Sequence, residues 1–384
     1  MKARYVLGIL SLATLLTVSA PWASYAAEAA KDSGSTINKE LQQLDAEAKL
    51  ANEQAYVVPD TLLAAFEAAS KQYKVPRDLL IAIGWTESRL SNHVGLPSFE
   101  NGYGIMNLVS NPVKQTLEKA SRLSGLDVNL LKSDDKSNIM GAAALLADFQ
   151  KTANPEFRES PNLPDWSGSV KMYLGSENDE LNASYLQQVL GTSKLLIPSG
   201  NKVTIKNEIV ISTLGGPPVV KPIWKAAHSS NYETGNRGRG TITHLVIHVM
   251  QGTYAGSISW AQQKHDGPSA AHYYVRSSDG EITQMVKDKD IAYHARSANS
   301  YTIGIEHEGY INDPGKWFTT TMYNESAKLA ALMCYSYGIP VDRDHIKGHS
   351  EYPNQTHTDP GSGWDWTTYM RYVNAWYAEY KRWE

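Results

Sequence analysis

Hydrophobic residues recur at helical spacing along the first half of the chain. After Pro59 and Asp60, apolar positions return every three or four residues as far as Tyr73, and Pro76 ends the run. Further helix-like stretches cover residues 79–85, 113–123, 138–150 and 166–174. Because no convincing strand pattern lies among them, we expect an all-α domain over residues 57–195.

The pattern changes to strands mixed with helices in residues 221–384. Apolar positions from 322 to 337 mark a helix that ends at Gly338. Short β-branched or aromatic runs predict strands at 245–249, 272–276, 281–286 and 302–307. This order of elements predicts an α/β domain. Pro, Gly and Ser residues in 196–220 predict a linker with at most one hairpin.

The first 26 residues have the three parts of a secretory signal peptide. Two basic residues precede an apolar stretch over 5–18, and small residues follow near Ala26 and Ala27. This apolar stretch is shorter than the roughly 20 residues that a membrane-spanning helix needs. We therefore expect cleavage after one of these two alanines and no transmembrane segment in the mature chain. The polar residues 27–56 predict a tether.

Composition narrows the class of partner and the compartment. The 384 residues are 42% hydrophobic, which is enough apolar surface for two folded cores. The 36 Lys and Arg against 40 Asp and Glu give a net charge of −4, which argues against a nucleic-acid partner. Cys334 is the single cysteine, so an intrachain disulfide is excluded. An exported chain without disulfides indicates a bacterial exterior, and we expect a secreted or cell-wall protein.

Three side chains in the second domain have the chemistry of a catalytic zinc site. His248 lies in a strand-like run, His349 follows Gly348, and Asp359 opens an Asp-Pro-Gly turn. Two imidazoles and one carboxylate leave the fourth tetrahedral position of Zn²⁺ free for water. Nothing local forces these distant residues together, however. Taken singly, each histidine could instead be packed or at the surface, and Asp359 could be an ordinary turn residue.

Several segments of this domain match a known family in order. They are Asn231-Tyr232, Val246-Ile-His248, Ser269-Ala-Ala-His-Tyr-Tyr274, Ala292-Tyr-His-Ala295, Ile303-Gly-Ile-Glu306, Gly348-His349, Thr358-Asp-Pro-Gly361 and Trp364-Asp-Trp366. Residues 221–366 thereby resemble the zinc-dependent N-acetylmuramoyl-L-alanine amidases of the peptidoglycan-recognition superfamily, also called amidase type 2. The resemblance implies a mixed β-sheet flanked by helices.

The resemblance also implies a site and a substrate. Zinc would be bound by His248, His349 and Asp359, and Glu306 would be the catalytic carboxylate. The substrate would be the muramyl peptide of peptidoglycan. Zinc-activated water would cleave the amide bond between N-acetylmuramic acid and L-alanine.

Strand alternation agrees with a reacting carboxylate at Glu306. It puts Thr302, Gly304 and Glu306 on one face, where Gly304 would leave space for a substrate to approach. The same alternation puts His307 on the core side and predicts a structural histidine. Glu308 shares the face of Glu306 but lies further along, which predicts a solvated charge at the strand end.

Three further histidines match family positions. His357 stands where many relatives carry a lysine, which implies a role in stabilising the oxyanion. The charge of a histidine there would depend on pH near neutrality, unlike that of lysine. His272 and His294 match positions that line or support the cleft. For these two, a role near the substrate and a packed, hydrogen-bonded histidine are both open.

The first domain resembles the lysozyme-like lytic transglycosylases. Glu87-Ser88 and Gly102-Tyr-Gly-Ile-Met-Asn107 resemble that family's Glu-Ser and Gly-Leu-Met-Gln elements. The resemblance implies that Glu87 acts as general acid and then base in glycan cleavage, provided that burial raises its pKa. Asn107 replaces the usual Gln, however. Glu87 could instead pair with Arg89, and a non-catalytic glycan-binding module is a third possibility.

The sequence therefore predicts a secreted peptidoglycan hydrolase whose second domain is a zinc amidase. One alternative is a bifunctional amidase and lytic transglycosylase. Another is a non-catalytic peptidoglycan-binding recognition protein, although such proteins commonly lack part of the metal set that is complete here. The signal peptide argues against a phage endolysin.

Overall fold

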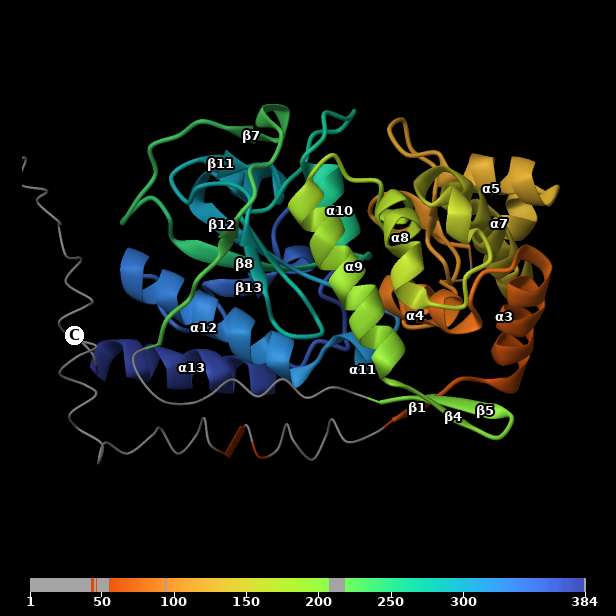
Figure 1. Cartoon of the computed structure of the whole chain (residues 1–384). Helices are drawn as coiled ribbons and strands as arrows, with labels where there is room; N and C mark the ends of the chain where they lie inside the picture. Colours follow the sequence, from red (N-terminus) through yellow and green to blue (C-terminus); the bar gives the residue numbers. More distant parts are fainter. Residues whose placement is uncertain (1–42, 45, 47–54, 94, 207–217, 383–384) are drawn as a thin grey trace, which may run out of the picture.

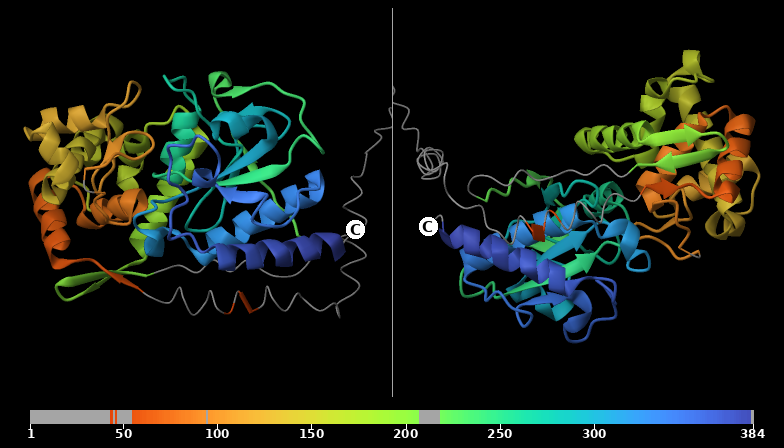
Figure 2. Two further views of the ribbon diagram at one scale, coloured as in Figure 1. Left: turned by 180° about the vertical axis from the view of Figure 1, so that it is seen from behind. Right: turned by 90° about the horizontal axis from the view of Figure 1, so that it is seen from below.

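The computed structural model describes residues 43–44, 46, 55–93, 95–206 and 218–382. The expected signal peptide, residues 1–26, lies outside the described residues, as does most of the expected tether. Every helix in the described part of the chain is too short or too polar to cross a membrane. Two regions lie side by side: a helical one in orange and yellow, and one built on a sheet in green and blue (Figures 1 and 2).

Helices dominate the first region, as the apolar spacing predicts. They are α3 (Asp60–Tyr73), α4 (Arg77–Ser88), α5 (Thr116–Ser124), α6 (Val128–Ser133), α7 (Asp135–Ala153), α8 (Ser167–Leu174) and α9 (Asp179–Lys194). Each helix-like stretch of the sequence falls on one of them, whereas α6 and α9 were not predicted. Residues of α4 are buried on nearly all sides of the helix, so its last turn carries Glu87 into the interior.

Short strands complete the first region, which is therefore helical without being purely α. They are β1 (Tyr56–Val57), β2 (Gly102–Tyr103), β3 (Leu108–Val109), β4 (Leu196–Ser199) and β5 (Lys202–Ile205). The hairpin of β4 and β5 forms at the start of the expected linker, and β5 also pairs with β1. Through Leu196, Val203 and Ile205, this hairpin joins the apolar core of the helices.

The second region is a six-stranded mixed sheet in the order β13-β8-β12-β9-β10-β6. Its strands are β6 (Ile223–Trp224), β8 (His244–Val249), β9 (Tyr273–Val275), β10 (Ile282–Gln284), β12 (Thr302–His307) and β13 (Ile346–Gly348). The central strand β12 runs parallel to β8 on one side and to β9 on the other, and β13 runs parallel to β8. β9 and β10 are antiparallel. The four predicted strands are all present in this sheet.

Two long helices cover one face of the sheet. α12 (Thr320–Tyr337) and α13 (Trp366–Arg382) lie together beneath it in Figure 1. Ile303 and Ile305 of β12 pack into the same apolar cluster as these helices. Residues at alternate positions therefore face the opposite side, which is left for the site. As predicted, α12 ends at Gly338, whose left-handed φ of 71° suits glycine.

The two regions share a tightly packed seam. His93 of the first region stacks on Tyr310 of the second with ring centroids 3.6 Å apart. The amide of Phe99 donates to the carbonyl oxygen of Gln251 at 2.9 Å. Residues of helix α10 (Tyr254–Ala261) belong to the same apolar cluster as the core of the first region. The core of the first region therefore continues across the seam to helix α10, whereas the core beneath the sheet is separate.

Candidate metal centre and active site

The parallel strands of the second region bring together the residues singled out in the sequence. Glu306 of β12 and His248 of β8 are direct partners in the strand register. Their side chains therefore leave the sheet on the same face. β13 lies on the other side of β8, and His349 follows its last residue directly. The strand order β13-β8-β12 thus places His248 between His349 and Glu306.

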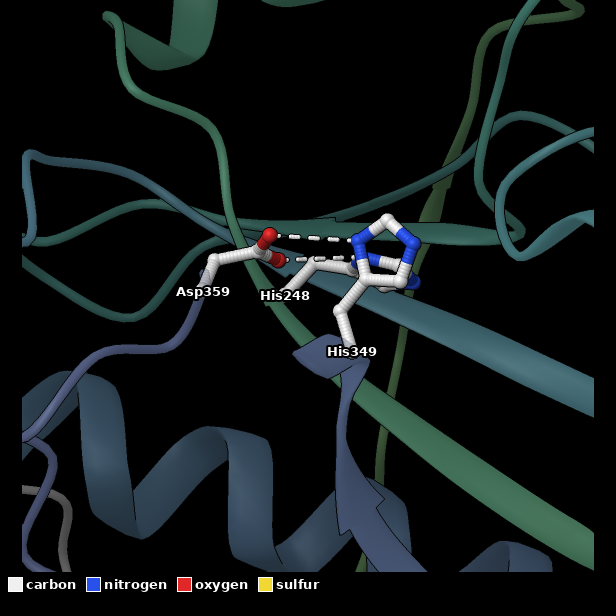
Figure 3. A group of neighbouring side chains, drawn as sticks. All are labelled: His248, His349 and Asp359. Atoms are coloured by element: carbon white, nitrogen blue, oxygen red, sulfur yellow. Dashed lines mark hydrogen bonds and ion pairs between the residues drawn. The ribbon is translucent and has the colours of Figure 1, made fainter. Parts of the chain in front are cut away.

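His248, His349 and Asp359 form one buried cluster (Figure 3). Nδ1 of His248 lies 3.2 Å from Oδ2 of Asp359, and Nδ1 of His349 lies 3.1 Å from Oδ1. One ligand atom from each residue can be chosen so that all lie within 4.8 Å of one another. Two imidazole nitrogens and one carboxylate oxygen at such spacing fit the donor set of a zinc site.

The protonation of these groups suits a cation. Burial lowers the pKa of His248 to about 4, so its imidazole is neutral and has a free lone pair at neutral pH. Burial alone would raise the pKa of Asp359. Its hydrogen bonds with His248 and His349 outweigh that effect and hold the pKa below its ordinary value. The cluster thus offers the neutral nitrogen of His248 and the negative oxygen of Asp359, which are forms that bind metals.

Glu306 lies on the edge of this cluster with part of its carboxylate unused. Its Oε1 is 4.0 Å from Nδ1 of His248. Its Oε2 is buried and has no hydrogen-bond partner among the described residues. Burial raises the pKa of Glu306 well above its ordinary value, and the charge of Asp359 adds to this. A buried carboxylate oxygen without a partner is suited to accept a proton.

His357 lies on the solvent side of the cluster. Its side chain is 61% exposed, and its Nδ1 is 4.0 Å from Oδ1 of Asp359. The ring stacks on that of His349 with centroids 4.8 Å apart. Burial and the neighbouring His349 lower the pKa of His357, so at neutral pH it is an uncharged N–H donor rather than a cation.

Two interpretations of β12 were wrong. Gly304 does not leave space for a substrate, because the ring of His294 fills it: a Cβ on Gly304 would lie 2.5 Å from Nδ1 of His294. Glu308 is not a solvated charge, because residues distant in sequence enclose its carboxylate. It is buried and accepts hydrogen bonds from the amides of Tyr254 at 2.9 Å and Ser277 at 2.8 Å.

Three other histidines near the site are packed and hydrogen-bonded. His307 is structural, as predicted: its Nδ1 lies 2.7 Å from the carbonyl oxygen of His248. Nδ1 of His272 accepts from the amide of Gly304 at 3.0 Å. His294 touches the cluster through Nε2 of His248 at 2.9 Å. Sequence reasoning did not single out Gln355, whose Oε1 lies 2.9 Å from Nε2 of His349.

Glu87 has a separate buried environment in the first region. Asn107 donates to its Oε2 at 2.9 Å, and the hydroxyl of Tyr185 donates to its Oε1. Burial raises the pKa of Glu87 to about 7. Asn107 also donates to Glu100 at 2.8 Å, which ties the two carboxylates together. Arg89 does not pair with Glu87; its guanidinium lies over the ring of Trp317, 4.5 Å from the centroid.

Comparison with known proteins identifies both regions. Residues 238–362 match the N-acetylmuramoyl-L-alanine amidase family, and residues 64–178 match the transglycosylase SLT domain. The chain is 39% identical to N-acetylmuramoyl-L-alanine amidase A of Achromobacter lyticus over 173 residues, which are 40% of this chain and 93% of that protein.

Two more distant relatives complete the comparison. The chain is 32% identical to 1,6-anhydro-N-acetylmuramyl-L-alanine amidase AmpD of Haemophilus influenzae over 112 residues, 27% of this chain and 58% of the relative. The crystal structure of Staphylococcus aureus hydrolase AmiA in complex with its ligand aligns with a TM-score of 0.35 and 18% identity, over 41% of this chain and 83% of that one. From the family match and the Achromobacter relative, the chain belongs to the N-acetylmuramoyl-L-alanine amidase family and carries a transglycosylase SLT domain ahead of its amidase domain.

Proposed function

We propose that this amidase is a zinc enzyme that is exported and acts on the cell wall. His248, His349 and Asp359 hold the zinc, and Glu306 moves the proton during hydrolysis of the bond between N-acetylmuramic acid and L-alanine. The proposal of export rests on the signal-peptide pattern of residues 1–26.

One observation carries the proposed chemistry. Donor atoms of two histidines and one aspartate, distant in sequence, converge within 4.8 Å, and an unpartnered carboxylate oxygen of Glu306 lies beside them. A non-catalytic recognition protein would not need this carboxylate on the same face as a complete ligand set. The arrangement therefore favours hydrolysis over binding alone.

The roles of the residues follow from their positions. Zinc bound by the three ligands would polarise the scissile carbonyl and lower the pKa of water to roughly 7. Glu306 accepts a proton as the water oxygen bonds to the carbonyl carbon. Because its pKa is raised, Glu306 can hold that proton until the carbon–nitrogen bond breaks, and then give it to the nitrogen of L-alanine. The products are a glycan carboxylate and a stem peptide with a free amine.

His357 assists at the rim of the site. Its exposed imidazole is free to turn an N–H toward the oxygen that gains charge during the attack. Since neutral imidazole suffices for this hydrogen bond, we expect His357 to contribute without being protonated.

Mass spectrometry of digested peptidoglycan tests the proposal. Purified protein should release stem peptides that begin at L-alanine, and metal analysis should find one zinc per chain. Asp359→Ala should lose both the zinc and the release. A chain that releases such peptides at an undiminished rate after its metal is removed would contradict the zinc mechanism.

A second, glycan-cleaving activity is the alternative that the first domain supports. A pKa of about 7 suits Glu87 to protonate a glycosidic oxygen. The C6 hydroxyl oxygen would then bond to C1, and its proton would return to Glu87, giving an anhydro product without water. Glu87 is only 2% exposed, however, and both of its oxygens already accept hydrogen bonds.

The amidase domain adds to this closure. Its helix α10 lies against Glu100, the carboxylate that is linked to Glu87 through Asn107. The contact is so close that a Cβ on Gly256 would lie 2.2 Å from Oε1 of Glu100. A glycan therefore reaches Glu87 only if the seam between the domains opens. For the chain as folded, we propose amide hydrolysis as the activity.

A further inference from the structure

An exposed arginine, Arg296, lies on the turn that borders the proposed zinc site. The carbonyl oxygen of Ala295, the residue before it, accepts from Nε2 of Gln355 at 3.0 Å. Oε1 of the same glutamine lies 2.9 Å from Nε2 of His349. One side chain therefore links this turn directly to a proposed zinc ligand.

Two hydrogen bonds fix the guanidinium of Arg296 beside the site. Nη1 donates to the carbonyl oxygen of Asn354 at 2.8 Å, and Nη2 donates to Oγ1 of Thr356 at 2.9 Å. Thr356 directly precedes His357, whose ring stacks on that of His349. The positive charge is therefore held on the solvent side of the metal cluster, where His357 is also exposed.

The backbone has an unusual conformation at both ends of this contact. Arg296 has a φ of 52° and Asn354 a φ of 61°, which lie in the left-handed region. Asparagine enters this region readily, whereas arginine rarely does. Residues held in such conformations cluster at ligand sites, because only a well-braced structure keeps them there. The conformation of Arg296 therefore favours a role in binding over that of an ordinary surface charge.

The charge of Arg296 is available to a ligand. Arg343 of the same region pairs with Glu351 at 2.6 Å, whereas no carboxylate among the described residues pairs with Arg296. A guanidinium also has more N–H groups than the two hydrogen bonds of Arg296 use. The planar anion that best matches such a group is a carboxylate.

The substrate carries its carboxylates on one side of the scissile bond. The carboxyl group of the muramic acid is the acyl part of that amide, so it has no charge before cleavage. The stem peptide, in contrast, has a carboxyl terminus and can have acidic side chains. A carboxylate that reaches Arg296 from an intact substrate therefore belongs to the stem peptide.

We propose that Arg296 binds a carboxylate of the stem peptide and so selects substrates whose peptide is negatively charged. This inference rests on the proposed function, because that function places the scissile amide at the metal cluster. Thr356 positions the guanidinium, since its hydroxyl oxygen holds Nη2. The contact is the same in the bound substrate and in the transition state, so it acts on KM rather than on kcat.

A pair of substrates tests the proposal. One is an N-acetylmuramoyl peptide with free carboxylates, and the other is the same peptide with each carboxylate converted to an amide. At low salt the KM of the wild type should be about 10-fold lower for the free acid. Arg296→Gln should abolish this preference by raising the KM of the free acid alone. Arg296→Lys keeps the charge but loses the planar fork, so it should recover part of the preference.

Three further variants separate recognition from general damage. Thr356→Val removes the acceptor of Nη2 and should weaken the preference, whereas Thr356→Ser should restore it. Arg239→Gln removes the same charge from an exposed arginine that lies against Gly338 at the end of α12, and it should keep the preference. Metal analysis and circular dichroism check that each variant holds zinc and has folded.

The outcomes distinguish this inference from the proposed function. Equal KM values of the wild type for the two substrates would overturn the selection by Arg296. So would an equal rise of both KM values in Arg296→Gln, because the loss would then be independent of the carboxylates. Either result leaves the proposed amide hydrolysis standing. If the wild type cleaves neither substrate, the proposed function fails, and this inference fails with it.

Discussion

Two neighbouring carboxylates in the amidase site have pKa values shifted in opposite directions, because only one of them is hydrogen-bonded to histidines. Asp359 is stabilised as an anion by two histidines, so its pKa lies below its ordinary value although burial opposes this. Glu306 has no such partner on Oε2, so burial raises its pKa well above its ordinary value. Where the pKa values of two carboxylic acids in one site are shifted in opposite directions, one can serve as a fixed negative charge and the other can transfer protons.

Glu306→Gln tests this division of roles. The amide has nearly the same shape but cannot take a proton, so hydrolysis should fall by a factor on the order of 10² to 10⁴. Zinc content should stay at the level of the wild type, because Glu306 is not one of the proposed ligands. Release of stem peptides is followed by mass spectrometry and zinc by metal analysis. Undiminished hydrolysis would remove Glu306 from the mechanism.

Glu87 makes the stability of the chain depend on pH. The unfolded chain loses this proton near pH 4.5, whereas the folded chain holds it until about pH 7. The unfolded state therefore binds fewer protons between these values, and stability falls as the pH rises across them.

In Glu87→Gln this loss should be absent. The stability of the variant relative to the wild type should increase by about 3 kcal/mol between pH 4.5 and pH 8. Any fixed cost of placing the amide beside Asn107 cancels in this comparison, because it is the same at each pH. Urea unfolding at several pH values measures the difference. A difference that is constant with pH would show that the pKa of Glu87 is the same in the folded and unfolded chains.

At the scale of elements, the sequence predicted what depends on a repeating pattern. The short β-branched runs of β8 and β12 and the helical spacing of α12 can be recognised in the sequence, and Gly338 marks the end of α12. The strands β2 and β3 have two residues each, which is too few to show a period. Their pairing is set by the turn between them, so the sequence pattern did not predict them.

The site shows the same division. The three proposed ligands and Glu306 were predicted from the order of family motifs, whereas no pattern in the sequence points to Gln355. The burial of Glu308 was also missed, because it depends on contacts with Tyr254 and Ser277, which are distant in sequence. Alternation along a strand assigns a side chain to a face, but it does not say what covers that face.

Gly304→Ala tests how closely β12 and His294 fit together. A Cβ would lie 2.5 Å from Nδ1 of His294, so the ring must move away from His248. We expect a loss of about 1 to 3 kcal/mol in the free energy of unfolding, together with weaker zinc binding. Gly191→Ala in α9 is the matched control, because nothing lies within 4 Å of its new Cβ.

That control should raise stability by about 0.5 to 1 kcal/mol through helix propensity alone. Chemical unfolding measures both variants, and chelator competition measures zinc. If Gly304→Ala is as stable and binds zinc as tightly as the wild type, the ring of His294 does not fill the space beside Gly304.

At the scale of the molecule, the first domain is joined to the strands that carry the site. Gln251, which accepts from Phe99, is three residues after His248, and Tyr310, which stacks on His93, is four residues after Glu306. Docking of the domains therefore joins the first domain to the segments that follow β8 and β12. We propose that any glycan cleavage by the first domain is coupled to this interface.

This coupling predicts that the docked chain does not cleave glycan. With Glu306→Ala present to remove amidase action, digested peptidoglycan should contain no anhydromuramyl ends. Adding Gly256→Val places a side chain where Glu100 now lies, so the seam should open and anhydromuramyl ends should appear. Adding Glu87→Gln should abolish the anhydromuramyl ends again. The control Gly315→Ala, whose Cβ meets nothing within 4 Å, should leave the seam closed.

Mass spectrometry counts these ends, and limited proteolysis reports whether the seam has opened. Anhydromuramyl ends released by Glu306→Ala alone would contradict the closure, because Glu87 would then be reached by the glycan while the domains are docked.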